Sequence, residues 1–332
     1  MVRLKRVGRD HFTIRRVRHG RSFGLRDAEG GKVTDPDIYE RVRALGIPPA
    51  WTDVRIAMAP NAHIQAVGTD AAGRLQYIYH ADWEARRTLQ KQVQLTSLTE
   101  ALPRIRRRVR DDLLEPAGSK RLALALGVAM IDRTAMRVGR ERYLDARGTR
   151  GAGTLYSRDV SVSDDMVTTR FPAKSGKLAH YQVRDRMLAE AVRKVKTIPG
   201  KRLLMYRGDD GTARPIRTDD INRYLREIGG APVRAKDFRT LHASALAAES
   251  LARLEPAESA SGRKRQMATV TRQVAAFLQN TPAICRASYV APCLYSLFDK
   301  GRLGEIWSLG GAGANGVRQR EVRLAAVLAA VE

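Results

Sequence analysis

The residues of this chain that could do chemistry are tyrosines and cations, because the common nucleotide-binding and metal-binding patterns are missing. None of its three Gly-Lys pairs has the earlier glycine that a phosphate-binding P-loop requires. The sequence has no H-E-x-x-H motif, and its two cysteines, Cys285 and Cys293, lack the four-ligand spacing of a zinc site. The aspartate pairs at 111–112, 164–165 and 219–220 are expected at helix ends and turns, so a two-metal nuclease is not favoured. We therefore expect no bound metal and no cofactor.

Phosphoryl transfer without a metal is the chemistry that these residue types still permit. It needs a nucleophile, cations that neutralise the equatorial oxygens, and a proton donor for the leaving oxygen. A tyrosine can attack, and arginine and lysine can supply the charge and the proton. Composition alone cannot choose among 60 lysines and arginines and ten tyrosines.

The charge of the chain indicates a polyanionic partner. A net charge of +25 and an isoelectric point near 10.8 favour nucleic acid. The hydrophobic fraction of 43% argues against a disordered basic tail. The longest apolar run, 122–131, stops at Asp132, which makes it too short to span a membrane. The charged start MVRLKRVGRD has no apolar segment behind it, so we expect a cytoplasmic, nucleoid-associated protein.

Residues 1–90 are predicted to form a small β-rich domain. The runs HFTIRRV, WTDVRIAM, HIQAVGTD and RLQYIYH have alternating or β-branched character and are separated by turn signals such as EGGK and DAAG. One short helix in DIYERVRALGIPPAW is expected to end before Gly46, because two prolines follow. Helical periodicity begins at Trp83, which places the domain boundary near 88–92. Both sides of this boundary carry a net positive charge.

Residues 91–332 are predicted to form a larger, mainly α-helical domain, so the fold class is α+β. Ser119 is a candidate N-cap for a central helix, whose apolar surface is too broad for an exposed one. A small β-sheet insert at about 154–183 is predicted from short strands joined by an Asp-Asp turn and a Lys-Ser-Gly-Lys turn. Helices are expected at 184–197, 218–229, 237–254, 264–279 and 291–299, followed by a linker at 309–316 and a last short helix.

Five sequence blocks over residues 45–300 resemble, in order, those of the poxvirus-like and bacterial type IB DNA topoisomerases. The blocks are PPAWTDVRIAM with HIQAVGTDAAGRLQYIYH, then RTAMRVGRERY, FPAKSGKLAHYQV, KDFRTLHAS and NTPAICRASYVAP. The resemblance implies a C-shaped clamp around double-stranded DNA, with a β-rich N-terminal domain and a helical catalytic domain related to the tyrosine recombinases. It also implies an enzyme that nicks one strand, lets the duplex rotate and reseals it without ATP or an obligatory metal.

The resemblance assigns a role to five residues of this sequence. Tyr289 aligns with the nucleophile that forms a 3′-phosphotyrosyl ester, and a phenol with a pKa of about 10 is a far better leaving group than an alkoxide, which makes the ester reversible. Arg137 and Arg239 match the arginines that grip the non-bridging oxygens, with planar forks that stay charged. Lys174 matches the hairpin lysine that protonates the departing 5′-oxygen. Lys236 stands at a basic position of the family and is expected to assist that proton transfer.

Asn280 departs from the viral pattern. Viral members and many recombinases carry a histidine nine residues before the nucleophile, and this chain has Asn280 there, as expected of the bacterial branch. An amide can still donate a hydrogen bond to a phosphate oxygen, but it never carries charge. The site is therefore expected to have one fewer titratable group than its viral counterpart.

Four residues are candidates for contact with DNA, and packing is an open alternative for each. Gln65, Gln76 and Tyr77 lie in the predicted β-rich domain, where alternate residues of a strand face the core or the groove. His242 follows Arg239 by three on the same helical face, and either a phosphate contact or a packed, capping histidine fits its position.

Two other functions compete with this interpretation. A tyrosine site-specific recombinase would share the nucleophile and both arginines, although the β-rich first domain belongs to the topoisomerase pattern. A non-catalytic, basic DNA-binding protein would satisfy the charge alone. Relaxation of a plasmid that lacks any special site, by a protein that we expect to be a monomer, distinguishes the three.

Overall fold

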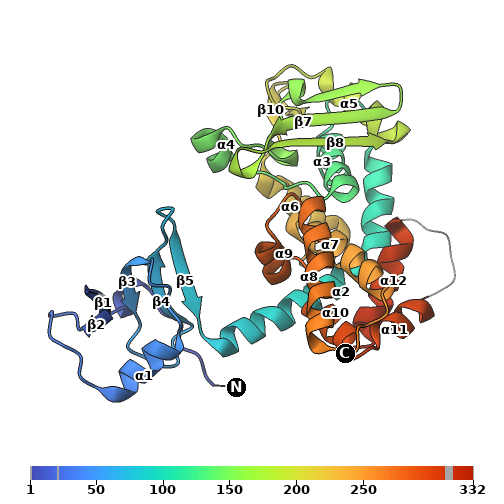
Figure 1. The fold of residues 1–332 in the computed structure, drawn as a ribbon. Coiled ribbons are helices and arrows are strands. Elements are labelled where there is room, and N and C mark those ends of the chain that lie inside the picture. Colours follow the sequence, from blue (N-terminus) through green and yellow to red (C-terminus); the bar gives the residue numbers. More distant parts are fainter. Residues whose placement is uncertain (1, 21, 311–316, 332) are drawn as a thin grey trace. The chain divides into compact units, whose positions relative to one another are not determined.

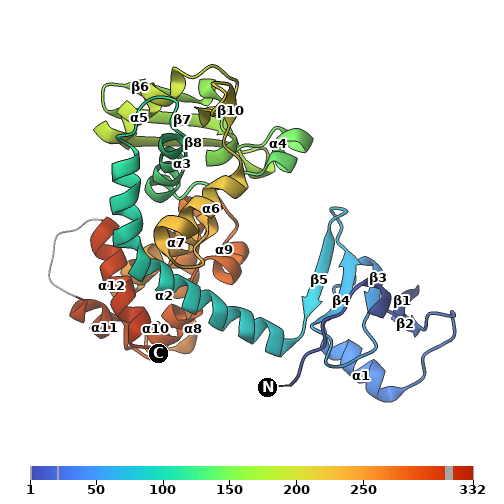
Figure 2. The same ribbon diagram turned by 180° about the vertical axis from the view of Figure 1, so that it is seen from behind.

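The computed structural model describes residues 2–20, 22–310 and 317–331, and the predicted α+β fold class is confirmed (Figure 1; seen from behind in Figure 2). The chain forms two compact units, Met1–Gln90 and Lys91–Glu332, and each is presented by itself. Most of the linker predicted at 309–316 lies outside the described residues.

The first unit is a five-stranded antiparallel sheet with one helix packed on it. The strands follow the order β2-β1-β3-β4-β5, with bounds β1 Ile14–His19, β2 Ser22–Arg26, β3 Thr52–Ile56, β4 Ile64–Thr69 and β5 Leu75–Tyr79. Alternation along β3 turns Val54 and Ile56 into the core. Helix α1, Pro36–Ala44, begins at the N-cap Asp35 and covers this core with one apolar face.

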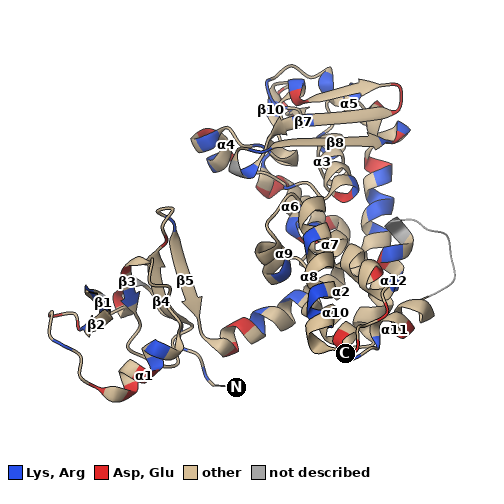
Figure 3. Cartoon of the chain, in the orientation of Figure 1, with Lys and Arg blue, Asp and Glu red and all other residues tan. Residues whose placement is uncertain are grey.

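Helix α2, Ala81–Asp112, starts in the first unit and continues into the second as one helix of 32 residues. Its buried side chains, which include Leu95, Leu98 and Ile105, recur at helical spacing in the second unit. Lysines and arginines are spread over both units, including the later half of α2 (Figure 3).

The second unit is built around α3, Lys120–Thr134, which is buried on all sides from Leu122 to Asp132. The long apolar run in the sequence is therefore a central helix, as its broad apolar surface predicts. Ser119 caps it by accepting a hydrogen bond from the Leu122 N–H. The C-cap Ala135 has a left-handed φ of 54°, which turns the chain sharply out of the helix.

A three-stranded antiparallel sheet, β6-β7-β8, lies in the second unit where the β-insert is predicted. Its strands are β6 Val160–Ser163, β7 Met166–Pro172 and β8 Leu178–Arg184, and a short 3₁₀ turn at Lys174–Gly176 joins the last two. Lys174 is thus carried on the exposed turn of a hairpin. A second, two-stranded sheet consists of β9 Met205–Arg207 and β10 Ala213–Pro215.

The remaining helices complete the second unit. They are α4 Glu141–Arg147, α5 Arg186–Lys196, α6 Thr218–Gly229, α7 Ala235–Ala252, α8 Ala260–Phe277, α9 Pro282–Ser288, α10 Pro292–Asp299, α11 Leu303–Leu309 and α12 Val317–Ala329. The sequence does not predict α9 or α11, because seven residues give fewer than two full turns and too few apolar repeats to show a period. The run 119–145, which is predicted as one central helix, is divided between α3 and α4, with a break after Thr134. Among the described helices, none is both long and apolar enough to cross a membrane.

The segment that follows α3 is fixed by the close approach of Gly139 to Gly151. Two carbonyl oxygens of this segment accept hydrogen bonds. The Ala152 N–H donates to the Arg137 oxygen (2.9 Å), and the Gly153 N–H donates to the Val138 oxygen (2.7 Å). Gly139 has a φ of +80°, and a Cβ there would overlap the Thr154 hydroxyl. Only glycine fits, so Arg137 sits on a backbone with little freedom to move.

We expect Gly139→Ala to lower the free energy of unfolding by about 2–4 kcal/mol, because the new methyl group meets both backbone strain and overlap. Gly148→Ala is the matched control, since Gly148 has a φ of +62° but nothing lies within 4 Å of an added Cβ. That control should lose only about 1 kcal/mol. Chemical denaturation measures both, and equal losses would contradict the close approach.

Candidate active site

Tyr289 stands at the junction between α9 and α10, where its backbone is fixed from two sides. It is the C-cap of α9, and its N–H donates to the Cys285 oxygen at 2.9 Å. The Ser244 hydroxyl of α7 donates to the Tyr289 carbonyl oxygen (3.2 Å) and accepts from the Ala291 N–H (3.1 Å). One buried hydroxyl thus ties the tyrosine to α7.

Two cations from the first turns of α7 lie close to the Tyr289 ring. The Arg239 Cζ atom is 5.1 Å from the ring centroid and the Lys236 Nζ atom is 5.7 Å from it. Burial by itself would raise the pKa of the Tyr289 phenol, but the positive charges of Arg239, Arg137 and Lys236 outweigh it, so that this pKa is lowered. The surroundings therefore favour the phenolate, which is the nucleophilic form.

Arg239 is a buried cation held by neutral groups. Its side chain is 2% exposed, and its two Nη atoms donate to the carbonyl oxygens of Ala135 and Leu278. Its Nε atom is buried without a hydrogen-bond partner among the described residues. Carbonyl oxygens orient a guanidinium but do not neutralise its charge, so the site is ready for an anion.

Arg137 lies beside Asn280 in the same region. Its Nη2 atom donates to the Asn280 Oδ1 atom at 2.6 Å, which turns the Asn280 amide nitrogen the other way. That nitrogen is buried and has no partner within the described chain. Burial lowers the pKa of the Arg137 guanidinium, and the positive charge of Arg239 lowers it further. Two arginines that repel each other and a spare amide donor make a site suited to a phosphate.

Lys174 shares a hollow with Arg137. The volume is about 330 Å³, and most of the polar side chains around it are basic. Its lining comprises Arg137, Val138, Gly139, Arg140, Tyr143, Arg147, Thr149, Arg150 and Lys174. The exposed hairpin lysine is thus on the same side of the second unit as one of the two arginines.

Two further residues near the arginines, Tyr181 and Cys285, are assigned no role by the sequence. Tyr181 of β8 is half-buried, and its ring stacks on Phe171 with 6.2 Å between centroids. Burial raises the pKa of the Tyr181 phenol, and the charges of Arg239 and Arg137 partly offset this. Burial likewise raises the pKa of the Cys285 thiol, with both arginines acting against it. No local sequence pattern indicates that Tyr181 or Cys285 lies near the arginines, because only the folded chain brings these residues together.

The candidate groove residues of the first unit divide by exposure. Gln65 is buried and hydrogen-bonded to Arg41 (2.9 Å), Pro60 and Ala62, so it has an internal role. Gln76 is half-buried and donates to the Asp70 carboxylate at 2.8 Å. On the opposite face of β5, Tyr77 is 45% exposed. Of the three, the structure leaves Tyr77 open to solvent.

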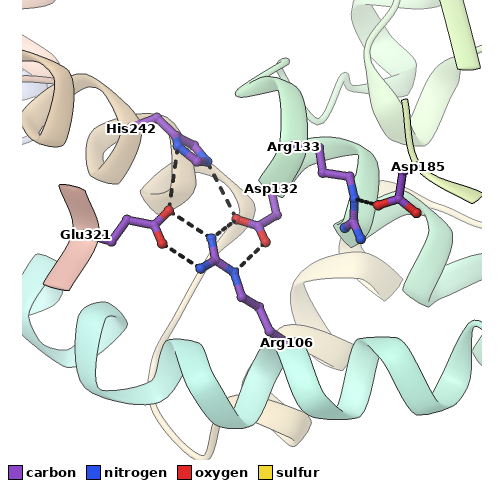
Figure 4. Close-up of polar contacts among 6 residues, drawn as sticks. All are labelled: Arg106, Asp132, Arg133, Asp185, His242 and Glu321. Carbon is purple, nitrogen blue, oxygen red and sulfur yellow. Dashed lines mark hydrogen bonds and ion pairs between the residues drawn. The ribbon is translucent and has the colours of Figure 1, made fainter. Parts of the chain in front are cut away.

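His242 lies in a buried group of charged residues (Figure 4) and has the packed position that was one of its two predicted roles. Its Nε2 atom is 3.6 Å from Asp132 Oδ1 and its Nδ1 atom is 3.9 Å from Glu321 Oε1. These three side chains are close enough together to share a metal ion. Arg106, however, donates to both carboxylates and already supplies the positive charge that a metal would bring.

Figure 4 also shows the Arg133–Asp185 ion pair, which joins α3 to the start of α5.

The structure brings together most of the residues predicted for catalysis. Tyr289, Arg239, Lys236 and Arg137 are near enough for their charges to act on one phenol, and Asn280 bonds to Arg137. Such a constellation can present a nucleophilic oxygen and neutralise a phosphoryl group. The roles of the individual side chains in a reaction remain predictions.

Comparisons with known proteins agree on one group of relatives. The family described as "Eukaryotic DNA topoisomerase I, catalytic core" matches residues 80–291. The family described as "Bacterial DNA topoisomerase IB, N-terminal domain" matches residues 22–70. A protein of Acanthamoeba polyphaga mimivirus named "DNA topoisomerase 1B" is 31% identical over 266 residues, which cover 78% of this chain and 79% of the viral one.

The Tyr289 phenol should ionise below the ordinary pH of about 10, because nearby cations stabilise the phenolate. The difference in phenolate absorbance between the unmodified protein and Tyr289→Phe isolates this group. Lys236→Met removes one of the cations and should move the ionisation to higher pH. Lys300→Met, at an exposed lysine outside the site, serves as the control. Ionisation of Tyr289 at or above pH 10 would contradict the geometry.

Proposed function

Because the chain belongs to the type IB DNA topoisomerases, an isomerase family, we propose that it relaxes supercoiled duplex DNA by transient cleavage of one strand at Tyr289. The observation that carries this proposal is the phenol of Tyr289 beside the unneutralised Arg239, with Lys236 and Arg137 close by. A site-specific recombinase would use similar groups, but the matched families cover both units of the chain and are topoisomerases.

The proposed cleavage step is a transesterification. The Tyr289 oxygen forms a bond to the scissile phosphorus, and the bond between that phosphorus and the 5′-oxygen of the neighbouring nucleotide breaks. Lys174 gives its proton to the departing 5′-oxygen, so that a hydroxyl leaves rather than an alkoxide. The tyrosine proton is lost to solvent as the phenolate forms. One phosphodiester is replaced by another, and therefore no ATP is needed.

Arg137, Arg239 and Asn280 are proposed to hold the phosphoryl oxygens. The Nε atom of Arg239 and the amide nitrogen of Asn280 are buried donors without partners in the described chain. A phosphate that bound between them would satisfy both donors and neutralise a charge that the fold leaves uncompensated. These fixed cations take the part that a metal ion has in other phosphoryl-transfer enzymes.

Religation uses the same groups in reverse. The 5′-hydroxyl attacks the phosphotyrosine, Lys174 takes back the proton, and the phenolate leaves into the positive surroundings that lower the pKa of Tyr289. A leaving group that is already stabilised makes the covalent state reversible. Strand rotation between the two steps relieves the supercoiling.

The first unit is proposed to complete the grip on duplex DNA. It carries its own net positive charge, and Tyr77 stands exposed on its outer strand β5. We propose that the two units clamp the DNA and that the enzyme works as a monomer at the nucleoid, retained there by a net charge of +25.

Tyr289→Phe should abolish the covalent protein–DNA adduct and all plasmid relaxation, because the attacking oxygen is gone. Duplex binding should stay within about twofold, since removing one hydroxyl leaves the phosphate contacts in place. Adducts are trapped with SDS on plasmid and on a labelled duplex. Tyr206→Phe is the control, at a half-buried tyrosine of β9 whose ring lies under the Lys120 ammonium. A Tyr289→Phe protein that still relaxes plasmid would refute the choice of nucleophile.

Relaxation should continue in EDTA and without ATP, because arginine and lysine supply the charge and one ester replaces another. The measurement is the linking-number distribution of a supercoiled plasmid that has no special site. A protein that merely binds DNA would shift the plasmid on a gel and leave its linking number unchanged. Strict dependence on a divalent cation would contradict the proposed mechanism.

A further inference from the structure

Four side chains from four helices form one cluster, which we name the Arg106 cluster (Figure 4). Three of them are buried and Arg106 is partly buried. Its members are Arg106 of α2, Asp132 of α3, His242 of α7 and Glu321 of α12. The Arg106 Nε and Nη2 atoms each donate to Asp132 at 2.8 Å. The Nη1 and Nη2 atoms donate to Glu321 at 2.5 and 2.8 Å. A single guanidinium thus bridges two carboxylates, while the two ring nitrogens of His242 face the same pair.

The carboxylates of this cluster depend on their partners because they are out of water. Asp132 is 8% exposed and Glu321 is 3% exposed. Burial tends to raise the pKa of the Asp132 carboxyl, yet the hydrogen bonds from Arg106 hold that pKa below its usual value. Removing one member would leave the others buried with fewer partners, so the cluster should fix the distances between its four helices.

The Arg106 cluster lies next to both arginines of the candidate active site along the chain. Asp132 is in the last turn of α3, three residues before Ala135, whose carbonyl oxygen accepts a hydrogen bond from Arg239. Arg137 follows on the segment that leaves this helix. His242 is one turn after Arg239 on α7. The cluster therefore joins the end of α3 to the start of α7, the two elements that set the separation of the arginines.

Glu321 is not needed to attach α12 to the domain. Leu324, Val327 and Leu328 of this helix are fully buried in the core. Arg320, the residue before Glu321, also pairs with Glu249 of α7. Because α12 has these other anchors, the carboxylate of Glu321 can be altered with most of the helix packing left in place.

We propose that Glu321 is a positioning residue for catalysis: through Arg106, Asp132 and His242, the C-terminal helix holds Arg137 and Arg239 at the spacing that the scissile phosphate requires. This inference rests on the proposed function for its account of what the arginines bind. Neither Glu321 nor α12 touches the reacting atoms in this scheme. Small displacements of catalytic groups lower the reaction rate strongly. Loss of this carboxylate should therefore slow cleavage by displacing the arginines from the scissile phosphate.

The test compares the full-length protein with Glu321→Gln, Glu321→Asp and the control Arg320→Gln, which breaks an ion pair of the same helix outside the cluster. Single-turnover cleavage of a labelled duplex should be about tenfold slower in E321Q, intermediate in E321D and within about twofold of the unmodified protein in R320Q. Duplex binding should be similar in all four.

A second readout separates positioning from general damage. The ionisation of Tyr289 is followed by phenolate absorbance without DNA, and it should move to higher pH in E321Q because the arginines that favour the phenolate are displaced. It should not move in R320Q. Cleavage by E321Q within twofold of the unmodified protein would overturn the proposal. So would slow cleavage with an unchanged Tyr289 titration, because the loss would then not act through the arginines.

Two further outcomes are decided by the same experiment. If thermal melting shows that E321Q does not fold, E321D is judged by both readouts, and an E321D protein equal to the unmodified one in cleavage and titration overturns the proposal. If the unmodified protein forms no covalent adduct, the proposed function fails. The titration does not use DNA and still tests whether Glu321 positions the arginines.

Discussion

The arrangement of the second unit depends on a buried positive charge, that of Arg239, which no carboxylate of the described residues neutralises. Burying a guanidinium is costly unless acceptors satisfy its hydrogen bonds, and a neighbouring carboxylate is the usual solution. Arg106 follows that rule, with two carboxylates around it. Arg239 is more deeply buried, and its two Nη atoms donate to carbonyl oxygens, with no carboxylate paired to it among the described residues. This contrast distinguishes Arg106, a structural arginine, from Arg239, whose charge stays available for an anion that binds reversibly.

The fold compensates for this charge by fixing its surroundings with backbone groups. The carbonyl oxygen that accepts from Arg239 belongs to Ala135, whose left-handed conformation ends α3 and directs that oxygen toward α7. Beyond it, the close approach at Gly139 holds the segment that carries Arg137. The arginines are thus positioned by elements whose own geometry is closely constrained, so little reorganisation is needed when charge develops on a phosphate.

Sequence patterns with short range predicted the fold class well. Alternation in β3 and the broad apolar run of α3 are local signals, and the α+β class that they indicate is confirmed. The identity of the candidate site came from the order of five blocks, since no local rule distinguishes Tyr289 from nine other tyrosines. The structure brings these predicted residues together, and their catalytic roles remain predictions.

Contacts between distant segments could not be predicted in the same way. His242 has two partners, Asp132 and Glu321. They lie on helices that are far from it in the sequence, one before it and one after it. Gln65 lies in a strand whose alternation allows either face, and its internal hydrogen bonds depend on a loop and on Arg41 of α1. Such partners are chosen by packing between elements, which a pattern within one element does not record.

The neutral Asn280 is consistent with the charge already present at the site. Burial lowers the pKa of the Arg137 guanidinium, and repulsion from Arg239 lowers it further, while Lys236 adds another positive charge close to Tyr289. A protonated imidazole in place of Asn280 would add to this repulsion before any phosphate is bound. An amide supplies a hydrogen-bond donor at no cost in charge, and its bond to Arg137 fixes which way the donor points. Arg137 is already charged at every working pH. Asn280 therefore helps to orient the bound phosphate and adds no further electrostatic attraction.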